Sequence, residues 1–295
     1  MSGALPAVAV VGLGLIGTSL ARRLRDAGFT VHGYDIDPAR AANFAGLGGV
    51  PAASLAAAAR VVKIVVLSVF NTDQVEAVVE GAGGAPSLEL ASGHAVVCTS
   101  TCDPDRIAAL AARAAARGVR VLEMPLSGNS DQIALGNGIG LVGGTRELMD
   151  ELAPVLGALC KKYFYLGAAG AAGRAKLAVN LIGGLNRAVM AEGLSFAEAM
   201  GIELEAFLEV LKASAAYSRT MDNRGLKMIR GDFAPHAKLS QSRKDFALMH
   251  EVAVRVGQQL PLAGLYVELI ESCLANGEGD LDNSAVMKEL RRRRN

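Results

Sequence analysis

The stretch from Val8 to Asp35, VAVVGLGLIGTSLARRLRDAGFTVHGYD, constrains the fold of this chain more than any other segment. A short apolar run leads into glycines at the spacing GxGxxG, which are Gly12, Gly14 and Gly17. An amphipathic segment follows, then a second apolar run that ends on an acid. The order strand, glycine turn, helix, strand and carboxylate predicts a βαβ unit that binds a dinucleotide.

Each part of this motif has a physical role. Gly12 permits a tight turn, Gly14 lets a pyrophosphate approach the backbone, and Gly17 allows helix and strand to pack closely. The free N–H groups at the start of the helix suit phosphate. Asp35 is placed to accept hydrogen bonds from both ribose hydroxyls and would repel a 2′-phosphate, so we expect NAD rather than NADP. Arg40, in the next predicted helix, is a weaker signal for the opposite choice.

Apolar strands and amphipathic helices alternate through the first half of the sequence. Further strands are expected at 60–69, 95–98 and 119–124, and helices at 38–44, 72–80 and 104–117. This alternation predicts an α/β Rossmann-type fold, a doubly wound parallel sheet with right-handed crossovers. Ligands of such sheets bind beyond the carboxyl ends of the strands. Those ends carry the glycine turn, Asp35, Ser68, Ser100, Thr101, Ser127 and Gly128.

The pattern changes after Gly167, in the small-residue run GAAGAAG. Everything beyond it is expected to be helical, in segments 173–200, 204–212, 221–229, 245–256 and 262–274. We therefore predict two domains. Residues 1–167 would form a Rossmann-type NAD-binding domain, and residues 168–295 an all-helical C-terminal domain that begins with a long interdomain helix.

The segment PLSGN at 125–129 follows a predicted strand. The hydroxyl of Ser127 and the exposed backbone N–H groups around Gly128 suit a substrate carboxylate. A plain glycine turn explains the pattern equally well.

Lys176 and Asn180 lie one helical turn apart and share a face of the predicted long helix. Oxidation of a hydroxyl to a carbonyl needs a base for the hydroxyl proton, and the reverse reaction needs the same group as an acid. A lysine performs this role if its pKa falls from ~10.4 towards 7–8. Most helical lysines are solvated charges, but apolar residues flank this one on both sides.

Lys244 and Asp245 are expected to open a C-terminal helix, where Asp245 would face the positive helix end. A surface charge is the ordinary interpretation of Lys244.

Composition excludes several classes of protein. The formal net charge is +1, so no overall field favours nucleic acid or an anionic membrane. No apolar run reaches the roughly 18 residues of a membrane helix.

The four cysteines form no C-x-x-C pair and are expected to be reduced, which predicts a cytoplasmic protein. No histidine pair has metal-ligand spacing, so no metal is expected. The basic run 291–294 is expected to be a solvated, frayed helix end.

Motifs along nearly the whole chain resemble the β-hydroxyacid dehydrogenases, the family of 3-hydroxyisobutyrate dehydrogenase and tartronate semialdehyde reductase. GLGLIGTSLARRL resembles the cofactor signature of that family, PLSGN its substrate loop PVSGG, GAAGRAKLAVN its catalytic helix GxGxxxKxxxN, and KDFAL its late KDL motif. The resemblance implies a dinucleotide domain, an all-helical domain and an active site between them. It also implies a homodimer or homotetramer.

The resemblance assigns roles to individual residues. Lys176 would be the catalytic lysine, and Asn180 would position the lysine or the substrate. Ser127 and Gly128 would bind the substrate carboxylate. The implied cofactor-binding residues are Gly12, Gly14, Leu15, Ile16, Gly17, Asp35, Ser68, Thr101 and Lys244.

The substrate loop departs from the family pattern PVSGGxxGAxxGxL. Asn129 replaces its second glycine, Gln132 and Ile133 replace Gly-Ala, and Gly138 replaces a common leucine. Asn129 and Gln132 are therefore expected to shape the substrate pocket, with Ile133 supporting them. A bulkier, more polar loop favours a more polar substrate than 3-hydroxyisobutyrate.

We therefore expect an NAD-dependent oxidoreductase that interconverts a small carboxylated 3-hydroxyacid and its semialdehyde, with a lysine as general acid and base. An NADPH-dependent semialdehyde or imine reductase is the alternative among enzymes, although imine reductases usually lack the lysine. A catalytically silent cofactor-binding module is the non-enzyme alternative, and the intact pair of Lys176 and Asn180 argues against it.

Overall fold

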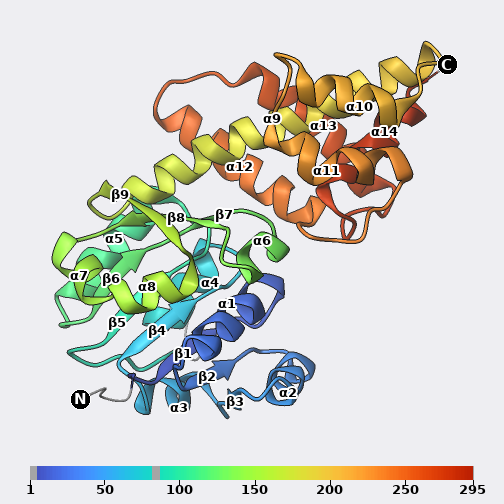
Figure 1. Cartoon of the computed structure of the whole chain (residues 1–295). Helices are drawn as coiled ribbons and strands as arrows, with labels where there is room; N and C mark the ends of the chain where they lie inside the picture. The colour runs from blue at the N-terminus through green and yellow to red at the C-terminus, as the bar shows by residue number, and fades with distance from the viewer. Residues whose placement is uncertain (1–4, 82–86, 295) are drawn as a thin grey trace. The chain divides into compact units, whose positions relative to one another are not determined.

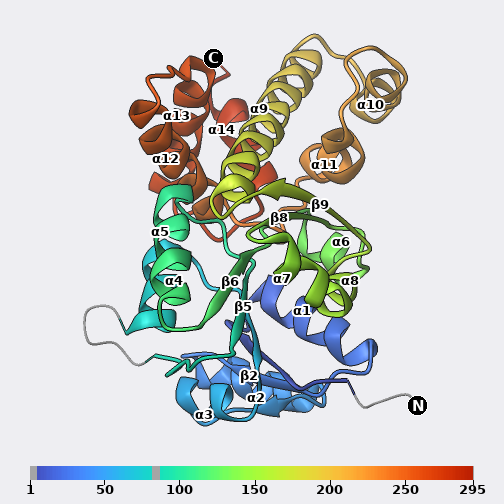
Figure 2. The same ribbon diagram turned by 90° about the vertical axis from the view of Figure 1, so that its left-hand side faces the viewer.

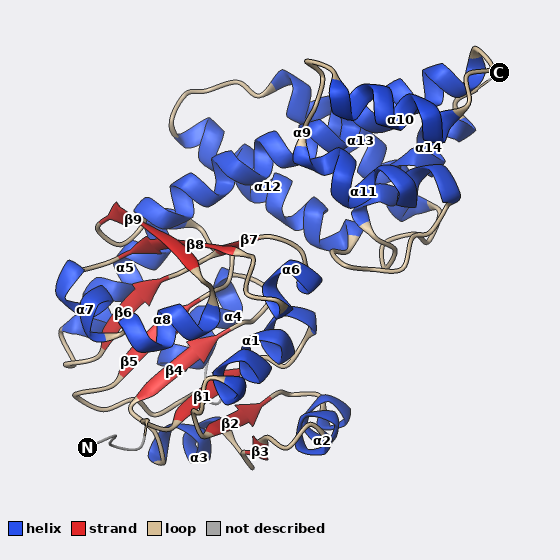
Figure 3. Cartoon of the chain, viewed as in Figure 1, coloured by secondary structure: helices blue, strands red, loops and turns tan. Residues whose placement is uncertain are grey.

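The computed structural model describes residues 5–81 and 87–294. The chain forms two compact units, residues 1–176 and 177–295. The long helix α9, Ala171–Ala199, runs through the boundary between them. Strands occur in the first unit, whereas the described part of the second unit is helical (Figure 3).

The first unit is built on one twisted sheet (Figure 1). Its strands are β1 Val8–Val11, β2 Val31–Tyr34, β3 Val50–Pro51, β4 Ile64–Leu67, β5 Ala95–Cys98, β6 Arg120–Glu123, β7 Leu126–Ser127, β8 Ile139–Gly143 and β9 Lys162–Gly167. The order is β3-β2-β1-β4-β5-β6-β8-β7, with β9 paired to β8. Strands β1 to β6 are mutually parallel, and β8 runs antiparallel to β6 and β7. The order 3-2-1-4-5-6 defines the Rossmann-type doubly wound sheet, so the predicted fold class is confirmed.

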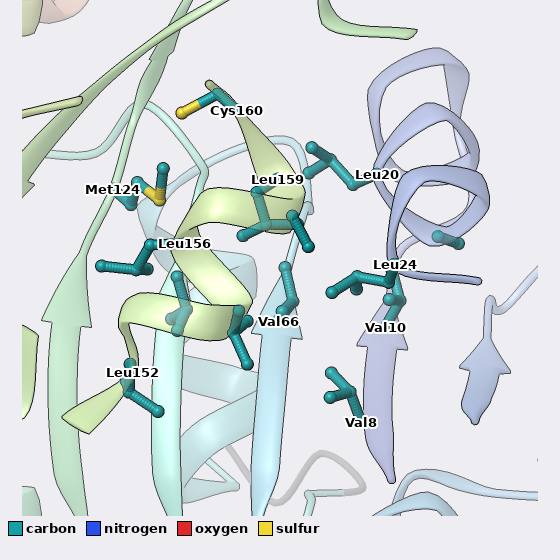
Figure 4. Close-up of a cluster of buried hydrophobic side chains, with 14 of the residues drawn as sticks. Val8, Val10, Leu20, Leu24, Val66, Met124, Leu152, Leu156, Leu159 and Cys160 are labelled. Carbon is teal, nitrogen blue, oxygen red and sulfur yellow. The ribbon is translucent and has the colours of Figure 1, made fainter. Parts of the chain in front are cut away.

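Helices cover both faces of this sheet (Figure 2). They are α1 Leu15–Asp26, α2 Pro38–Gly46, α3 Leu55–Arg60, α4 Thr72–Glu80, α5 Pro104–Ala115, α6 Ser130–Ala134, α7 Arg146–Glu151 and α8 Ala153–Leu159. One buried cluster joins α1 and α8 to the sheet, and Figure 4 shows some of its side chains, among them Val8 and Val10 of β1, Leu20 and Leu24 of α1, and Leu156 of α8. A second cluster joins α3, α4 and α5 to the opposite face. Strand residues alternate between the two clusters, because successive side chains of a strand point to opposite faces.

The second unit packs its helices around a single apolar cluster. Besides most of α9 it contains α10 Leu204–Ala213, α11 Arg219–Arg230, α12 Leu239–Arg255, α13 Pro261–Ala275 and α14 Val286–Arg292. A buried ion pair joins α11 to the loop before α14, with Arg224 Nε 3.1 Å from Oδ1 of Asp282. Burial opposes ionisation of Asp282, but Arg224, the Ser284 hydroxyl and backbone N–H groups hold the pKa of this carboxyl below its usual value.

Two local predictions for this unit are wrong. Helix α12 begins at Leu239 and not at Asp245, so Asp245 lies in the second turn rather than at the positive helix end. The helix has no side-chain cap, and the polar run SQSRK directly follows its first residue, so no clear sequence signal marks its start. The terminal arginines also do not fray into solvent, because Arg291 and Arg294 pair with Glu198 of α9.

Within residues 5–81 and 87–294, no helix combines the length and the apolar character needed to cross a membrane.

Candidate active site

The turn between β1 and α1 uses its glycines for different reasons. Gly12 has φ +90°, and a Cβ there would overlap the carbonyl oxygen of Ser68. A Cβ on Gly17 would overlap the carbonyl oxygen of Gly12. At Gly14, in contrast, the nearest atom to an added Cβ is Nη1 of Arg40 at 3.9 Å. Packing within the chain therefore explains Gly12 and Gly17, whereas Gly14 borders open space, as the approach of a pyrophosphate requires.

Helix α1 begins at this turn. Gly14 is its N-cap residue, makes no side-chain cap, and the first turn carries no acid. The positive end of the helix and its free N–H groups are thus not neutralised locally, which suits a phosphate. Leu15 is half exposed, whereas Ile16 packs against the core, so Ile16 contributes to this turn through packing and its backbone.

Asp35 follows β2 and its side chain is 5% exposed. Its carboxylate accepts the N–H of Leu13 at 2.7 Å and that of Asp37 at 2.9 Å. Nη1 of Arg40 lies 3.5 Å from the same carboxylate. The acid is therefore fixed beside the glycine turn, with a cation next to it.

Ser68 and Thr101 follow β4 and β5, at the carboxyl ends of neighbouring strands. Strand order reverses between β1 and β4, which is where ligands of this fold bind. The Ser100 hydroxyl ties the two loops together, because it donates to the Val69 carbonyl at 2.8 Å and accepts the Val69 N–H at 3.0 Å. Ser68 and Thr101 are both half-buried.

Ser127 ends β7, and Gly128, at φ +147°, follows it in an exposed turn. Asn129 is the N-cap of α6 and forms a reciprocal capping box with Gln132. The Asn129 side chain accepts the Gln132 N–H at 2.8 Å, and Oε1 of Gln132 accepts the Asn129 N–H at 3.0 Å. These oxygens are engaged in capping, so both residues first of all fix the turn that carries Ser127 and Gly128.

Ile133 and Gly138 compensate each other in volume. Ile133 is buried, and a Cβ at Gly138 would lie 3.0 Å from Cγ1 of Ile133. The isoleucine fills the space that a leucine at position 138 would otherwise occupy. This pair of departures is explained by packing in the core of the first unit.

Lys176 lies in the second turn of α9 and is only 7% exposed. On the same helix the apolar residues Val179 and Ile182 are exposed, by 40% and 61%. A buried lysine beside exposed aliphatic side chains reverses the usual preference of these residue types.

Asn180 belongs to the second unit and is held by Asp245. Its Nδ2 donates to Oδ2 of Asp245 at 2.9 Å, and Nζ of Lys244 lies 2.9 Å from Oδ1 of the same carboxylate. Asp245 is 8% exposed. Sequence reasoning missed this role, because it placed Asp245 at a helix end.

Glu123 is a second residue that sequence reasoning missed. It ends β6, is 3% exposed, and accepts backbone N–H groups from Gly170 and Gly173 at the start of α9. The signal in the sequence that could have pointed to Glu123 was an acid at the end of an apolar strand.

Among residues 5–81 and 87–294, no group of three or more His, Cys, Asp and Glu side chains could hold a metal ion.

Comparisons with known proteins match the two parts of the chain to two family models. Residues 7–167 match the family model described as the NAD binding domain of 6-phosphogluconate dehydrogenase. Residues 170–290 match the model described as NAD-binding of NADP-dependent 3-hydroxyisobutyrate dehydrogenase.

Curated relatives match along almost their full length. L-threonate dehydrogenase of Cupriavidus necator is 32% identical over 95% of each chain. The 2-hydroxy-3-oxopropionate reductase of Escherichia coli is 29% identical over 95% of each chain. Among solved structures, 3-hydroxyisobutyrate dehydrogenase from Salmonella typhimurium superposes with a TM-score of 0.86 at 29% identity, covering 96% of this chain and 99% of that one.

The fold, the glycine turn and these relatives define an oxidoreductase of the NAD(P)-dependent dehydrogenase class that acts on hydroxyacids. Within this class of oxidoreductases, the chain belongs to the β-hydroxyacid dehydrogenase family.

Proposed function

We propose that this chain is an NAD-dependent enzyme that interconverts a small, polar 3-hydroxyacid and its semialdehyde, with Lys176 as general acid and base. The observation that carries the proposal is the burial of Lys176, at 7% exposure, on a helix whose neighbouring aliphatic residues are exposed. Burial disfavours the charged form of a lysine, which suits a group that must exchange a proton.

The residues of the first unit fit a nicotinamide dinucleotide. The open space at Gly14 and the fixed carboxylate of Asp35 support binding of pyrophosphate and ribose. When bound, the nicotinamide ring supplies the acceptor or donor of hydride. Asp35 supports NAD, and Arg40 beside it keeps NADP as the alternative.

The protein's own groups then divide the remaining work. In oxidation, Nζ of Lys176 takes the proton of the substrate hydroxyl, and in reduction it returns a proton to the carbonyl oxygen. The amide of Asn180, held by Asp245, orients the lysine or the reacting oxygen. The Ser127 hydroxyl and the backbone of Gly128 bind the substrate carboxylate.

The relatives support a short, polar, anionic substrate. Their names refer to L-threonate, 2-hydroxy-3-oxopropionate, 2-(hydroxymethyl)glutarate and 3-sulfolactaldehyde. Each of these compounds has a short carbon chain, an acidic group, and a hydroxyl or carbonyl group. We therefore rank short polar hydroxyacids above 3-hydroxyisobutyrate, with a primary 3-hydroxyl giving a semialdehyde and a secondary hydroxyl, as in L-threonate, giving a ketone.

The test is turnover of a panel containing L-threonate, glycerate, 2-(hydroxymethyl)glutarate and 3-hydroxyisobutyrate, with NAD and with NADP. Lys176→Ala is the negative variant, and Lys63→Ala, an exposed lysine at the start of β4, is its matched control. We expect oxidation of at least one polar hydroxyacid, lost in Lys176→Ala and kept in Lys63→Ala. Cofactor binding without turnover of any panel member, in either direction, would instead support a silent binding module.

We also infer a cytoplasmic homodimer or homotetramer. Ile182, Val189 and Phe196 of α9 recur every seven residues and are 61%, 69% and 65% exposed, an apolar stripe suited to a second copy of the chain. Light scattering on the wild type and on Val189→Asp tests the assembly, and a monomeric wild type contradicts it.

A further inference from the structure

Glu123 carries a buried charge that the proposed reaction does not use. It is the last residue of β6 and is 3% exposed. Burial raises the pKa of its carboxyl, while hydrogen bonds from the N–H groups of Gly170, Gly173 and Ala172 act in the opposite direction. A buried carboxylate is costly unless it is satisfied, and here the backbone satisfies it.

The backbone donors all belong to the start of α9. Gly170 donates to Oε1, and Gly173 donates to Oε2 at 3.0 Å. The first turn of a helix leaves its N–H groups without partners in the helix. The first turn of α9 holds no acid of its own. The carboxylate that accepts its N–H groups comes instead from a strand that lies 47 to 50 residues earlier in the sequence.

The surrounding glycines leave room for this carboxylate. Gly143 pairs with Glu123 across β6 and β8, and a Cβ on Gly143 would lie 2.5 Å from Oε1. A Cβ on Gly173 would lie 3.1 Å from Oε2. The carboxylate thus lies directly against the backbone of two glycines. A side chain at either position would displace it.

Lys176 lies three residues beyond Gly173, almost one helical turn along α9. Because a helix is stiff over one turn, the anchor at Gly170 and Gly173 sets the axial position and rotation of Lys176 relative to the sheet of the first unit. We propose that Glu123 is a positioning residue, whose carboxylate fixes the first turn of α9 and so places the ammonium group of Lys176. This inference rests on the proposed role of Lys176 as the acid–base group.

Glu123→Gln is the direct test. The amide keeps the size of the side chain but turns one oxygen acceptor into an NH₂ donor that faces a backbone N–H. The turn must then shift, and we expect kcat per cofactor-binding site to fall about 10- to 100-fold, the range for misplacing a catalytic group by about 1 Å. The KM for NAD should stay within about twofold, because the glycine turn and Asp35 are untouched. A merely stabilising role would lower the melting temperature and leave kcat of the folded protein unchanged.

Hydrogen exchange gives a readout that does not depend on activity. Peptides covering residues 168–180 should exchange faster in Glu123→Gln than in the wild type. Glu123→Asp keeps the charge but is shorter by one methylene, so it should recover part of the lost kcat; it also serves as the test variant if Glu123→Gln does not fold, with a severalfold lower kcat expected. Glu151→Gln is the matched control, because Glu151 pairs with Arg120 at the opposite end of β6.

The outcomes separate this inference from the proposed function. Loss of kcat in Glu123→Gln with an unchanged KM for NAD, faster exchange at 168–180 and a normal Glu151→Gln supports it. Wild-type kcat in the Glu123 variants, or a parallel loss of NAD binding, overturns it. Full turnover in Lys176→Ala would remove the proposed mechanism itself, whatever Glu123→Gln does.

Discussion

Nη1 of Arg40 lies 3.5 Å from Oδ2 of Asp35, while the same carboxylate accepts the N–H of Leu13 at 2.7 Å. The acid expected to bind the ribose is thus fixed to the glycine turn. The arginine side chain is 54% exposed and can turn away from the acid. We therefore expect cofactor choice in this chain to depend on two adjacent groups with opposite preferences.

Asp35→Ser should narrow the preference for NAD over NADP. The carboxylate repels a 2′-phosphate and accepts ribose hydroxyls, and a charge-assisted hydrogen bond contributes roughly 1.5–3 kcal/mol, so the ratio of kcat/KM values should change by at least about tenfold. Adding Arg40→Ala to this variant should lower its kcat/KM with NADP again, since the Arg40 guanidinium is the cation beside position 35 that can pair with a 2′-phosphate. A wild type that prefers NADP would contradict the assignment.

Lys176→Ala should lower kcat by roughly 10²–10⁴-fold, the usual contribution of a general acid–base group. Lys176→Arg should not restore it, because a guanidinium does not release its proton near neutral pH. NAD affinity, measured by fluorescence titration, should be almost unchanged in both variants. The rate of oxidation should rise with pH in the wild type, since the neutral amine is the proton acceptor. Near-normal kcat in Lys176→Ala would mean that another group transfers the proton.

Asn129→Ala should destabilise the first unit by about 0.5–2 kcal/mol through loss of the cap on α6. Asn129→Ser keeps a capping oxygen and is the control. If the capping box positions Ser127 and Gly128, the substrate KM rises in the alanine variant and stays normal in the serine variant. Equal increases in both variants would mean that the Asn129 amide contacts the substrate. A separate variant that combines Asn129→Gly, Gln132→Gly and Ile133→Ala restores three residues of the family loop and should alter the substrate profile.

Ile133→Ala and Gly138→Leu should each destabilise the chain, by roughly 2–5 kcal/mol and 1–3 kcal/mol respectively. Together they should cost less than the sum, with a coupling of about 0.5–3 kcal/mol, because the leucine fills the space vacated by the isoleucine. Denaturant titration of the four proteins measures this cycle. Leu135→Ala, at a side chain that is 66% exposed, replaces Ile133→Ala in the control cycle and should give additive effects.

Local patterns were enough to predict most of the fold. The helix 72–80 and the start of the next helix at residue 104 were confirmed, because the period of the apolar residues and the helix-starting residues lie in consecutive positions. The glycine turn and Asp35 were predictable for the same reason. Short helices such as α6, α7 and α8 were not predicted, since one or two turns give too little periodicity.

The rest of the candidate site depends on pairings across the chain. The bond of Asn180 to Asp245 spans 65 residues, and that of Glu123 to Gly173 spans 50. No local pattern encodes either partner. The capping box Asn129–Gln132 has the local pattern Asn-x-x-Gln, but the same two residues are also departures from the family loop, which predicts a role in the substrate pocket instead.

The close fit of Glu123 between Gly143 and Gly173 restricts the order in which this region can change during evolution. A methyl group at position 143 would lie 2.5 Å from Oε1 and 3.0 Å from the backbone N of Ala172, so alanine there requires both the acid and the first turn of α9 to shift. By the proposal above, a shortened acid would hold the start of the helix that carries Lys176 less firmly. A change at any one of these three positions is therefore expected to disturb the other two, and we expect them to be exchanged as a set or kept as they are.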